Sequence, residues 1–308
     1  MTKSTPLLLC RPVGGLNDIL SQIDNACRYA ELAGRTVVVE TDSPSTAHFK
    51  DAFSNYFISK QPYLRLSAAN YKHLFDTLEV YPTCLFGRVN SYAARYMHEK
   101  QGYVDAETST RLSFDFNRLY NEPLLVHHSD GSNGNSLSAL GRMRLHDGIV
   151  DTLVDRLRTI GSPYSAIHIR HTDYQTNYES ELIKLQPLIR GAIFLATDNR
   201  VVVEFCRSIF GNDRVYSFAR LPDRAGKPVH LLESGDPTYQ INKDAIVDLL
   251  LLALARRFYC FSLKNNIQGT QHSGFTVLAS RLKNFPLVLH YLIGRCDEAF
   301  DAVLPIYR

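Results

Sequence analysis

The segment Ser165–Tyr174 carries the densest group of side chains in this chain that could do chemistry. A short apolar strand in it ends in His168, Arg170, His171 and Asp173. Because side chains alternate along a strand, His168 and Arg170 share one face. A guanidinium is always charged, and its planar fork of donors fits a pair of phosphate oxygens. The segment alone indicates either an anion site or a strand end whose polar groups pair on the surface.

A second candidate is Gly14-Gly15-Leu16-Asn17-Asp18, which joins a predicted strand to a predicted helix. Two glycines permit a sharp turn and the close approach of a ligand, and the first N–H groups of the helix can bind an anion. The segment matches neither the GxGxxG pattern nor the P-loop, which disfavours nicotinamide dinucleotides and ATP hydrolysis. An ordinary tight turn, with Asn17 or Asp18 as the helix cap, remains the alternative.

Three further polar residues have both a structural and a functional interpretation. Asp248 interrupts the apolar run from Ala245 to Ala255, where a buried carboxylate needs a partner and a bound nucleotide is one candidate. Asp198 is either a ligand contact or the cap of a helix beginning at Arg200. His168 is either a ligand contact or a core histidine with its hydrogen bonds satisfied.

The elements that must position these residues alternate between strand and helix, which predicts parallel sheets. In the first half only a helix around Ser91–Lys100 is expected within the mixed region Asp42–Asn121. The other expected elements of this half are a strand Leu7–Val13, a helix Ile19–Ala33 ended by Gly34, and strands Thr36–Glu40 and Leu124–His128, the last followed by a polar loop Ser129–Asn135. In the second half the expected strands are Ser165–Arg170, Ala192–Ala196, Arg214–Phe218 and Phe258–Phe261, and the expected helices are Asp147–Thr159, Arg200–Phe210, Asp244–Arg256 and Phe275–Leu282.

We therefore predict an α/β fold with two Rossmann-like, doubly wound domains that face each other across a cleft. The predicted boundaries are 1–145 for the N-terminal domain and 146–308 for the C-terminal domain. Ligands of such sheets bind outside the carboxyl ends of the strands. The polar segments described above all follow such strand ends, so we expect them to converge on one site.

Gly-Gly-Leu-Asn near the N-terminus, with His-Ile-Arg-His-Thr-Asp in the second half, resembles the fucosyltransferase superfamily. This group includes the α1,2-, core α1,6- and protein O-fucosyltransferases and the nodulation fucosyltransferase. The family's HxRxxD motif is matched by His168, Arg170 and Asp173. The second and third motif regions resemble Phe194–Asn199, Asp248, Cys260–Ser262 and Ser273–Phe275.

The resemblance implies a GT-B-type fold, GDP-fucose as the donor, inversion at the anomeric carbon, and no metal or other cofactor. It also implies that residues 1–145 form the acceptor-side domain and residues 146–308 the nucleotide-sugar-binding domain. Arg170 would hold the β-phosphate of GDP and His168 would contact the nucleotide. Asp248 would accept hydrogen bonds from the guanine edge. The remaining nucleotide-binding residues that the resemblance implies are Gly14, Gly15 and Asn17 from across the cleft, Asp198, Ser262, and a helix N-terminal phosphate cradle of Ser273, Gly274 and Phe275.

The sequence departs from the family pattern in two places. His171 follows Arg170 where many relatives have a second arginine, and an extra loop, Leu263–His272, precedes the third motif. An inverting transfer also needs a base near the acceptor hydroxyl. The candidates are the carboxylates of Asp173 and Glu179, with His171 as a third choice.

Composition narrows the function classes. The 308 residues are 45% hydrophobic and 21% charged, as in a globular protein that is not embedded in a membrane, and the net charge of +3 is too small to indicate nucleic-acid binding. No apolar run reaches the roughly 20 residues of a membrane span.

The N-terminus lacks signal-peptide features, and the cysteines are scattered without metal-like spacing, so we expect a reduced, cytoplasmic protein without structural metal. The cysteines are Cys10, Cys27, Cys84, Cys206, Cys260 and Cys296.

These observations together predict a cytoplasmic fucosyltransferase that acts on a glycan or glycolipid acceptor in the assembly of a surface polysaccharide. Two alternatives remain open. One is a glycosyltransferase of the same fold with a different nucleotide sugar, and the other is a non-catalytic nucleotide or glycan binder. A Rossmann-type oxidoreductase is disfavoured because the turn at Gly14-Gly15 lacks the third glycine.

Overall fold

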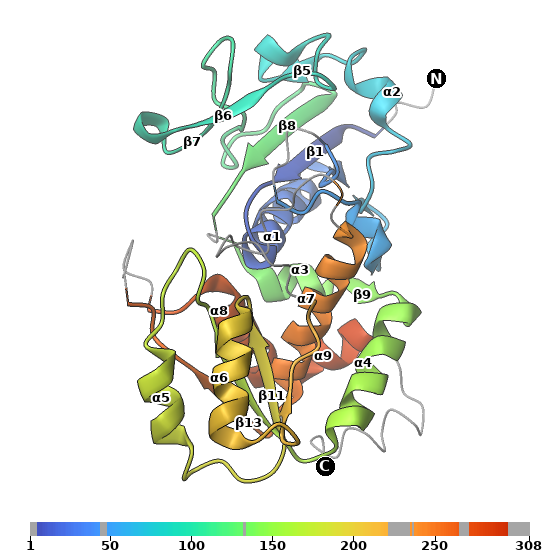
Figure 1. Ribbon diagram of the computed structural model, residues 1–308. Helices are drawn as coiled ribbons and strands as arrows, with labels where there is room; N and C mark the ends of the chain where they lie inside the picture. The colour runs from blue at the N-terminus through green and yellow to red at the C-terminus, as the bar shows by residue number, and fades with distance from the viewer. Residues whose placement is uncertain are drawn as a thin grey trace. The chain divides into compact units, whose positions relative to one another are not determined.

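A computed structural model describes residues 5–43, 48–131, 134–220, 235, 237–264 and 271–294 (Figure 1). The chain divides into two compact units, Met1–Arg144 and Leu145–Arg308. Each unit is built on its own parallel sheet. Cys296 and residues 265–270 of the loop before the third motif lie outside the described residues, as do residues 132–133 of the loop after Leu124–His128.

The N-terminal unit has a five-stranded parallel sheet in the order β4-β2-β1-β8-β5. The central strand β1 (Leu7–Pro12) is buried along its whole length, as expected of a strand covered on both faces. Leu7 is in register with Thr36 on one side and with Leu124 on the other. The neighbouring strands are β2 (Thr36–Val39), β4 (Leu64–Arg65), β5 (Val80–Tyr81) and β8 (Leu124–Ser129).

One face of this sheet is covered by helix α1 (Leu16–Ala33), which ends at Gly34 in the left-handed conformation, with φ of 64°. A glycine is favoured there because it lacks the Cβ that penalises this conformation. The other face packs against a cluster that includes Phe75, Leu85 and Leu112. The remaining elements of the unit are α2 (Lys72–Phe75), α3 (Ser136–Gly141), the short 3-10 helices Phe53–Asn55, Thr83–Leu85 and His98–Lys100, and strands β3 (Phe57–Ser59), β6 (Ala94–Met97), β7 (Gly102–Asp105) and β9 (Met143–Leu145).

The helix expected around Ser91–Lys100 is wrong. Ala94–Met97 is strand β6, which pairs antiparallel with β7, and only His98–Lys100 forms a helical turn. Gln101 takes a left-handed conformation, with φ of 47°, between the two strands. The local helix propensity of this segment is thus overridden by hairpin pairing, which closes through that residue.

The C-terminal unit has a four-stranded parallel sheet in the order β12-β11-β10-β13. Ile167 and Ile169 of β10 pack with α5 and α6 on one face. His168, on the alternate side of the strand, contacts α8 on the other face. The strands are β10 (Ser165–Ile169), β11 (Ile193–Thr197), β12 (Val215–Tyr216) and β13 (Arg257–Cys260). The helices are α4 (Asp147–Ile160), α5 (Tyr178–Leu185), α6 (Arg200–Phe210), α7 (Thr238–Leu254), α8 (Gly274–Asn284) and α9 (Pro286–Ile293).

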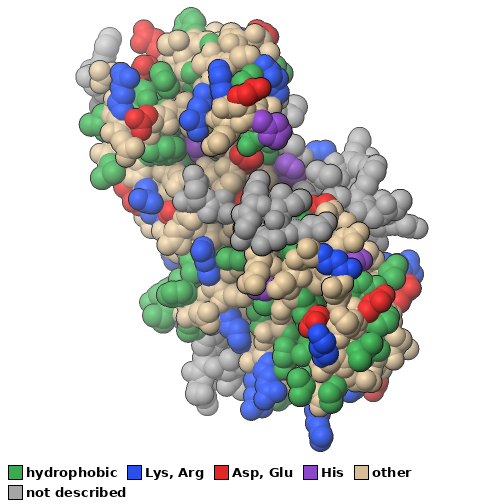
Figure 2. All heavy atoms as spheres, turned by 90° about the vertical axis from the view of Figure 1, so that its left-hand side faces the viewer, with side chains coloured by type: hydrophobic (Ala, Val, Ile, Leu, Met, Phe, Trp, Pro, Cys, Tyr) green, Lys and Arg blue, Asp and Glu red, His purple; other side chains and the backbone are tan. Residues whose placement is uncertain are grey.

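The predicted α/β class with parallel sheets is confirmed, and most predicted strands and helices are found within a few residues of their expected bounds. Two helices of the C-terminal unit, α5 and α9, were not expected from the sequence. No helix in the described part of the chain has the length and hydropathy needed to cross a membrane. On the face drawn in Figure 2, Lys and Arg side chains lie among Asp and Glu rather than in one continuous basic stripe.

Candidate functional site

Arg170 follows β10 directly, and its guanidinium lies between two carboxylates. Nε is 2.9 Å from Oδ1 of Asp173 and 3.1 Å from Oδ2 of Asp198. Nη2 is 2.6 Å from the same oxygen of Asp173. The Arg170 side chain keeps 20% of its surface exposed and that of Asp173 keeps 32%, so solvent and solutes reach this ion pair.

Asp198 holds the loop that follows β10 against the end of β11. Its Oδ1 accepts a hydrogen bond from the backbone N–H of His171 at 2.8 Å, and its Oδ2 accepts one from the Thr172 hydroxyl at 2.6 Å. The cap of α6 is its neighbour Asn199, whose Oδ1 accepts from the N–H of Val201 at 2.9 Å. The capping alternative for Asp198 is therefore wrong, and its carboxylate instead positions the segment that carries Arg170.

His168 is buried and joins the end of β10 to the first turn of α8. Its Nδ1 is 2.6 Å from Oγ1 of Thr276, and its ring lies 5.2 Å from that of Phe275. Ser273 caps the helix by accepting a hydrogen bond from the Thr276 N–H at 3.2 Å. Burial, and secondarily the charge of Arg170, lowers the pKa of His168 to about 3. The imidazole is therefore neutral at physiological pH and acts as a fixed hydrogen-bonding link.

The first turn of α8 has the properties of an anion-binding position. The early N–H groups of a helix, here those of Gly274 and Phe275, have no carbonyl partner within the helix. They carry the positive end of the helix dipole, which favours a negatively charged ligand. His168 of β10 hydrogen-bonds Thr276 in this turn, so the turn lies beside the end of β10, after which Arg170 follows. A fixed cation and a helix N-terminus are thus linked at the carboxyl end of β10.

Asp248 belongs to a different cluster, within helix α7. Its Oδ1 is 3.1 Å from Nη1 of Arg156 on α4, and the same guanidinium binds Asp244 and lies 5.1 Å from the ring of Phe218. Burial is the main cause that raises the pKa of Asp248 to about 8; Arg156 opposes the rise and Asp244 adds to it. The partner that a buried carboxylate needs is therefore supplied by the protein itself.

Two other predicted residues lie apart from the contacts of Arg170 and His168. Glu179 is exposed in the first turn of α5. Ser262 is exposed just beyond the carboxyl end of β13, the strand next to β10. Glu179 hydrogen-bonds the neighbouring Tyr178, and among the described residues neither Glu179 nor Ser262 contacts Arg170 or His168.

In the N-terminal unit, the predicted glycine turn follows β1. Gly14 has φ of 112°, and a Cβ there would lie 2.8 Å from Oδ2 of Asp18, so only glycine fits this position. The N–H groups of Gly14 and Gly15 donate to His48 Nδ1 and to Asp18 Oδ2, both at 3.2 Å. Asn17 is 6% exposed, and its Oδ1 has no hydrogen-bond partner among the described residues. A buried acceptor without a partner is costly, which makes it a marker of a binding position.

Sequence reasoning missed Thr276 and Arg156, the protein partners of His168 and Asp248. The Ser-x-x-Thr spacing at residues 273–276 could have indicated a helix cap, whereas nothing local indicated that Arg156 pairs with Asp248. No cluster of three or more His, Cys, Asp or Glu suited to a metal ion occurs among the residues that the structure describes.

Solved fucosyltransferase structures share this fold. NodZ alpha-1,6-fucosyltransferase, in a crystal soaked with GDP-fucose, matches with a TM-score of 0.57 and 16% identity over 90% of this chain and 92% of that one. NodZ from Bradyrhizobium matches with the same TM-score, identity and coverage. The apo form of POFUT1 matches with a TM-score of 0.54 and 12% identity over 92% of this chain and 96% of that one.

No protein-family model and no curated protein sequence matches the chain. At identities of 12 to 16%, the structural matches establish the fold. The chain therefore has the GT-B fold of these fucosyltransferases, as the sequence resemblance predicted.

Proposed function

We propose that this chain is a glycosyltransferase that transfers fucose from GDP-fucose to a hydroxyl group of a glycan, with inversion and without a metal ion. The observation that carries the proposal is that Arg170 follows the carboxyl end of β10, where His168 of the same strand contacts the first turn of α8. A cation and a helix N-terminus are together suited to a diphosphate. The fold is that of NodZ, a fucosyltransferase whose crystal was soaked with GDP-fucose.

In the proposed reaction, Arg170 exchanges the carboxylate of Asp173 for phosphate oxygens of the donor. The two ligands present similar oxygen pairs to the planar guanidinium, so the exchange needs little rearrangement of Arg170. As the bond to the sugar breaks, negative charge grows on the departing diphosphate. A positioned positive group stabilises such charge by about 3 kcal/mol, judged from oxyanion-hole donors.

The same exchange gives Asp173 a second role. Once Arg170 binds phosphate, the Asp173 carboxylate is released from that ion pair and becomes the group we assign as the base for the acceptor hydroxyl. Asp198, which holds the backbone of His171, keeps the loop in place during the exchange. On the family resemblance we assign Gly14, Gly15 and Asn17 to the same reaction.

One observation favours a second candidate, a glycosyltransferase of this fold with a different nucleotide base. Asp248, expected to read the guanine edge, is already paired with Arg156. A carboxylate that is neutralised in this way is a weaker acceptor for the guanine N–H groups. The choice of base is therefore what the first experiment must measure.

The experiment is a calorimetric titration with GDP, GMP, UDP and ADP in metal-free buffer. We expect GDP to bind most tightly, and Arg170→Ala to weaken it at least tenfold, because a hydrogen bond to a charged group contributes about 1.5–3 kcal/mol. The matched control is Arg158→Ala, an exposed arginine on α4 of the same unit, which should bind GDP like the wild type. Preference for UDP or ADP would support the second candidate, and absence of diphosphate binding would overturn the proposal.

Turnover is tested separately, by the release of GDP from GDP-fucose in the presence of a panel of glycans. Release that depends on a glycan is the expected result. GDP binding without release on any glycan would instead support a non-catalytic binder. Where the wild type does release GDP, Asp173→Asn should retain GDP affinity while losing release, which separates the base from the donor site.

A further inference from the structure

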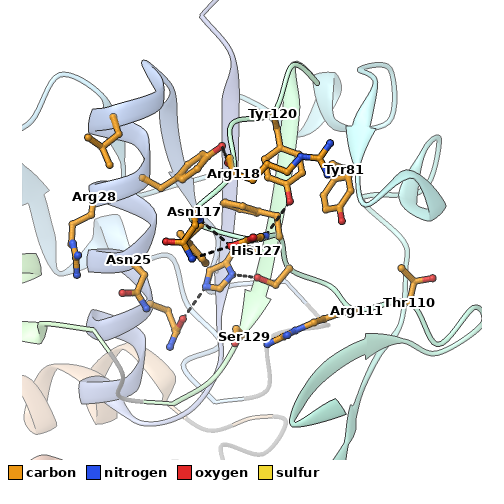
Figure 3. Close-up of a pocket in the computed structure, with 17 residues that line it drawn as sticks. Asn25, Arg28, Tyr81, Thr110, Arg111, Asn117, Arg118, Tyr120, His127 and Ser129 are labelled. Carbon is orange, nitrogen blue, oxygen red and sulfur yellow. Dashed lines mark hydrogen bonds between the residues drawn. The ribbon is translucent and has the colours of Figure 1, made fainter. Parts of the chain in front are cut away.

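A pocket of about 820 Å³ lies within the N-terminal unit and is not part of the site proposed above (Figure 3). Its walls come from helix α1, from the segment 110–120, and from strand β8 with Tyr81. Figure 3 shows His127 in the middle of the view, with Arg28 on the α1 side and Arg111 and Arg118 from the segment 110–120.

The floor of the pocket is a neutral histidine in a fixed tautomer. Nε2 of Gln22 donates to the carbonyls of Asp130 and Gly131, so its Oε1 must accept from His127 Nε2, at 2.8 Å. His127 Nδ1 then accepts from the Ser113 hydroxyl at 2.7 Å. Burial, and secondarily Arg111, lowers the pKa of His127 to about 4. The charge of the pocket therefore lies on its walls and not on its floor.

The walls are positively charged. Arg28, Arg111 and Arg118 line the pocket with one carboxylate, Asp115, a balance of three positive charges to one negative. All three arginines are exposed, and within the described residues none of them takes part in an ion pair. The whole chain has 34 basic and 31 acidic residues, so the pocket concentrates a positive charge that the chain as a whole hardly has. Such a concave, basic surface attracts anions.

Aromatic rings line the rest of the pocket. Tyr81 and Tyr120 are half-buried, with centroids 4.7 Å apart and planes inclined by 48°. Phe116 meets the His127 ring edge-on, with an interplanar angle of 88°. These pairs present no parallel faces between which a flat base could insert. The Arg118 guanidinium lies over the Tyr120 ring, 5.0 Å from its centroid. The ring surface that it leaves uncovered suits the apolar face of a pyranose, and Asn117 and Ser129 add hydrogen-bonding groups.

We propose that this pocket binds an oligosaccharide that carries carboxylate or sulfate groups. The arginines hold its anionic groups, and the half-buried rings pack against its sugar units. The further step, that this oligosaccharide is the acceptor of the transfer, rests on the function proposed above. Binding at the pocket does not depend on that function.

The test is a calorimetric titration of the full chain with three probes of equal length: a hyaluronan hexasaccharide carrying carboxylates, a heparin-derived hexasaccharide carrying sulfates, and neutral chitohexaose. We expect at least one acidic probe to bind tenfold more tightly than chitohexaose. Arg111→Gln/Arg118→Gln should reduce that binding at least tenfold. The matched control is Arg65→Gln, an exposed arginine in β4 outside the pocket, which should bind like the wild type.

Each other outcome overturns the inference. Equal affinity for acidic and neutral probes would show that the arginines do not select the ligand. Absence of binding would show that the pocket is not a saccharide site. Equal losses in the double variant and in Arg65→Gln would indicate non-specific attraction to a basic surface. Should the double variant fail to fold, judged by its circular dichroism, Arg28→Gln on α1 provides the same test with one exposed side chain.

A GDP titration on the same double variant separates this inference from the proposed function. GDP affinity should be unchanged, since Arg170 and α8 belong to the other unit. If the wild type bound the acidic saccharide but not GDP, the inference about the pocket would be supported and the proposed function would be overturned. GDP binding without saccharide binding would do the reverse.

Discussion

Each unit places an arginine near the carboxyl end of a central strand, and the two arginines are used differently. Arg11 of β1 is 1% exposed and is paired with Glu40, which is also 1% exposed, with Nε 2.6 Å from Oε2. Its Nη1 donates to the carbonyl of Val89 at 2.7 Å, and its guanidinium lies 4.9 Å from the ring of Tyr92. Arg170, after β10, remains 20% exposed between Asp173, which is 32% exposed, and Asp198, which is 8% exposed.

The difference shows that the surroundings of an arginine, and not its place on a strand, decide its use. Segments of the N-terminal unit cover Arg11 and accept its hydrogen bonds, so its role is to join β1 to Glu40 and Val89 inside the unit. A buried pair of this kind adds little net stability but is costly to break. Arg170 pairs with groups that a ligand can replace. The comparison predicts that Arg11 matters for folding and Arg170 for binding.

The variant with the largest expected effect on stability is Arg11→Met. Among the described residues it leaves the buried Glu40 with Lys72 as its ion-pair partner, 3.1 Å away and 45% exposed, so we expect the free energy of unfolding to fall by about 3–5 kcal/mol. Arg170→Ala should lower it by only about 1 kcal/mol, since its pair with Asp173 is solvent-accessible and Asp198 keeps the hydrogen bonds from the His171 N–H and the Thr172 hydroxyl. Urea unfolding followed by circular dichroism measures both.

The control for this test is the double variant Arg11→Met/Glu40→Leu, which removes both charges and should recover most of the loss. If Arg11→Met alone were as stable as the wild type, Lys72 would suffice to neutralise Glu40. The contrast between the two arginines would then fail.

The sequence could predict what depends on neighbours along the chain. The continuous apolar runs of β1 and β10, the helix α1 and its terminal Gly34 are local features, and they were found as expected. The strand-end position of His168 and Arg170 is of the same kind. Residue type and spacing carry that information directly.

What the sequence could not predict is joined across long separations. His168 and Thr276 are 108 residues apart, and Arg156 and Asp248 are 92 apart. The hairpin β6–β7 overrides the helix propensity of its first strand by pairing with its second. The basic pocket is formed by α1 and the segment 110–120, and neither has a local pattern typical of a binding site.

The two units should also differ in how their stability changes at acid pH. In the described part of the N-terminal unit burial lowers the pKa of His127 to about 4, that of His128 to about 3 and also that of His48, whereas the described part of the C-terminal unit has one such histidine, His168. As the pH falls below about 6.5, the unfolded chain binds protons that these folded histidines do not, so stability falls. Each histidine contributes a slope of at most about 1.4 kcal/mol per pH unit down to its folded pKa.

We therefore expect the N-terminal unit to lose stability as the pH falls from 6.5 to 4.5. In the C-terminal unit the loss at His168 is offset over the same range by Asp248, whose proton the folded state binds more tightly than the unfolded chain does. Hydrogen-exchange mass spectrometry in graded urea, corrected for the intrinsic exchange rate at each pH, resolves the two units by their peptides. His128→Leu should reduce the slope of the N-terminal unit and leave that of the C-terminal unit unchanged. Equal slopes in the wild type would contradict this part of the comparison.

In the C-terminal unit, Asp248 should make stability depend on pH in the opposite direction, so that its contribution falls as the pH rises. Its folded pKa, about 8, lies above the unfolded value of about 3.9, so the folded state binds its proton more tightly. That stabilisation is complete below pH 3.9 and is lost as the pH rises to about 8, with a slope of at most about 1.4 kcal/mol per pH unit. Between pH 6.5 and 8, above the range in which His168 contributes, Asp248→Asn should flatten the slope, as measured by exchange in peptides of α4 and α7. A slope unchanged in the variant would show that another group is responsible.

The smallest test compares two helix caps, one in each unit. Ser273 caps α8, and Asn135 caps α3, where its Oδ1 accepts from the N–H of Ser138 at 3.4 Å. Replacing either residue by alanine should cost about 1 kcal/mol of unfolding free energy, because each leaves a helix N–H group without its acceptor. Stability alone therefore does not distinguish the two caps.

GDP affinity does distinguish them. Ser273 also contacts Thr276 Oγ1 at 3.1 Å, and that hydroxyl holds His168, so its loss loosens the turn that we assign to the diphosphate. We expect Ser273→Ala to weaken GDP binding several-fold, whereas Asn135→Ala, in the other unit, binds GDP like the wild type. Ser273→Thr keeps a hydroxyl that can accept the same hydrogen bond and should restore the affinity. Equal GDP affinity in both alanine variants would mean that the α8 turn is only a capped helix end, and the anion site would then reduce to Arg170.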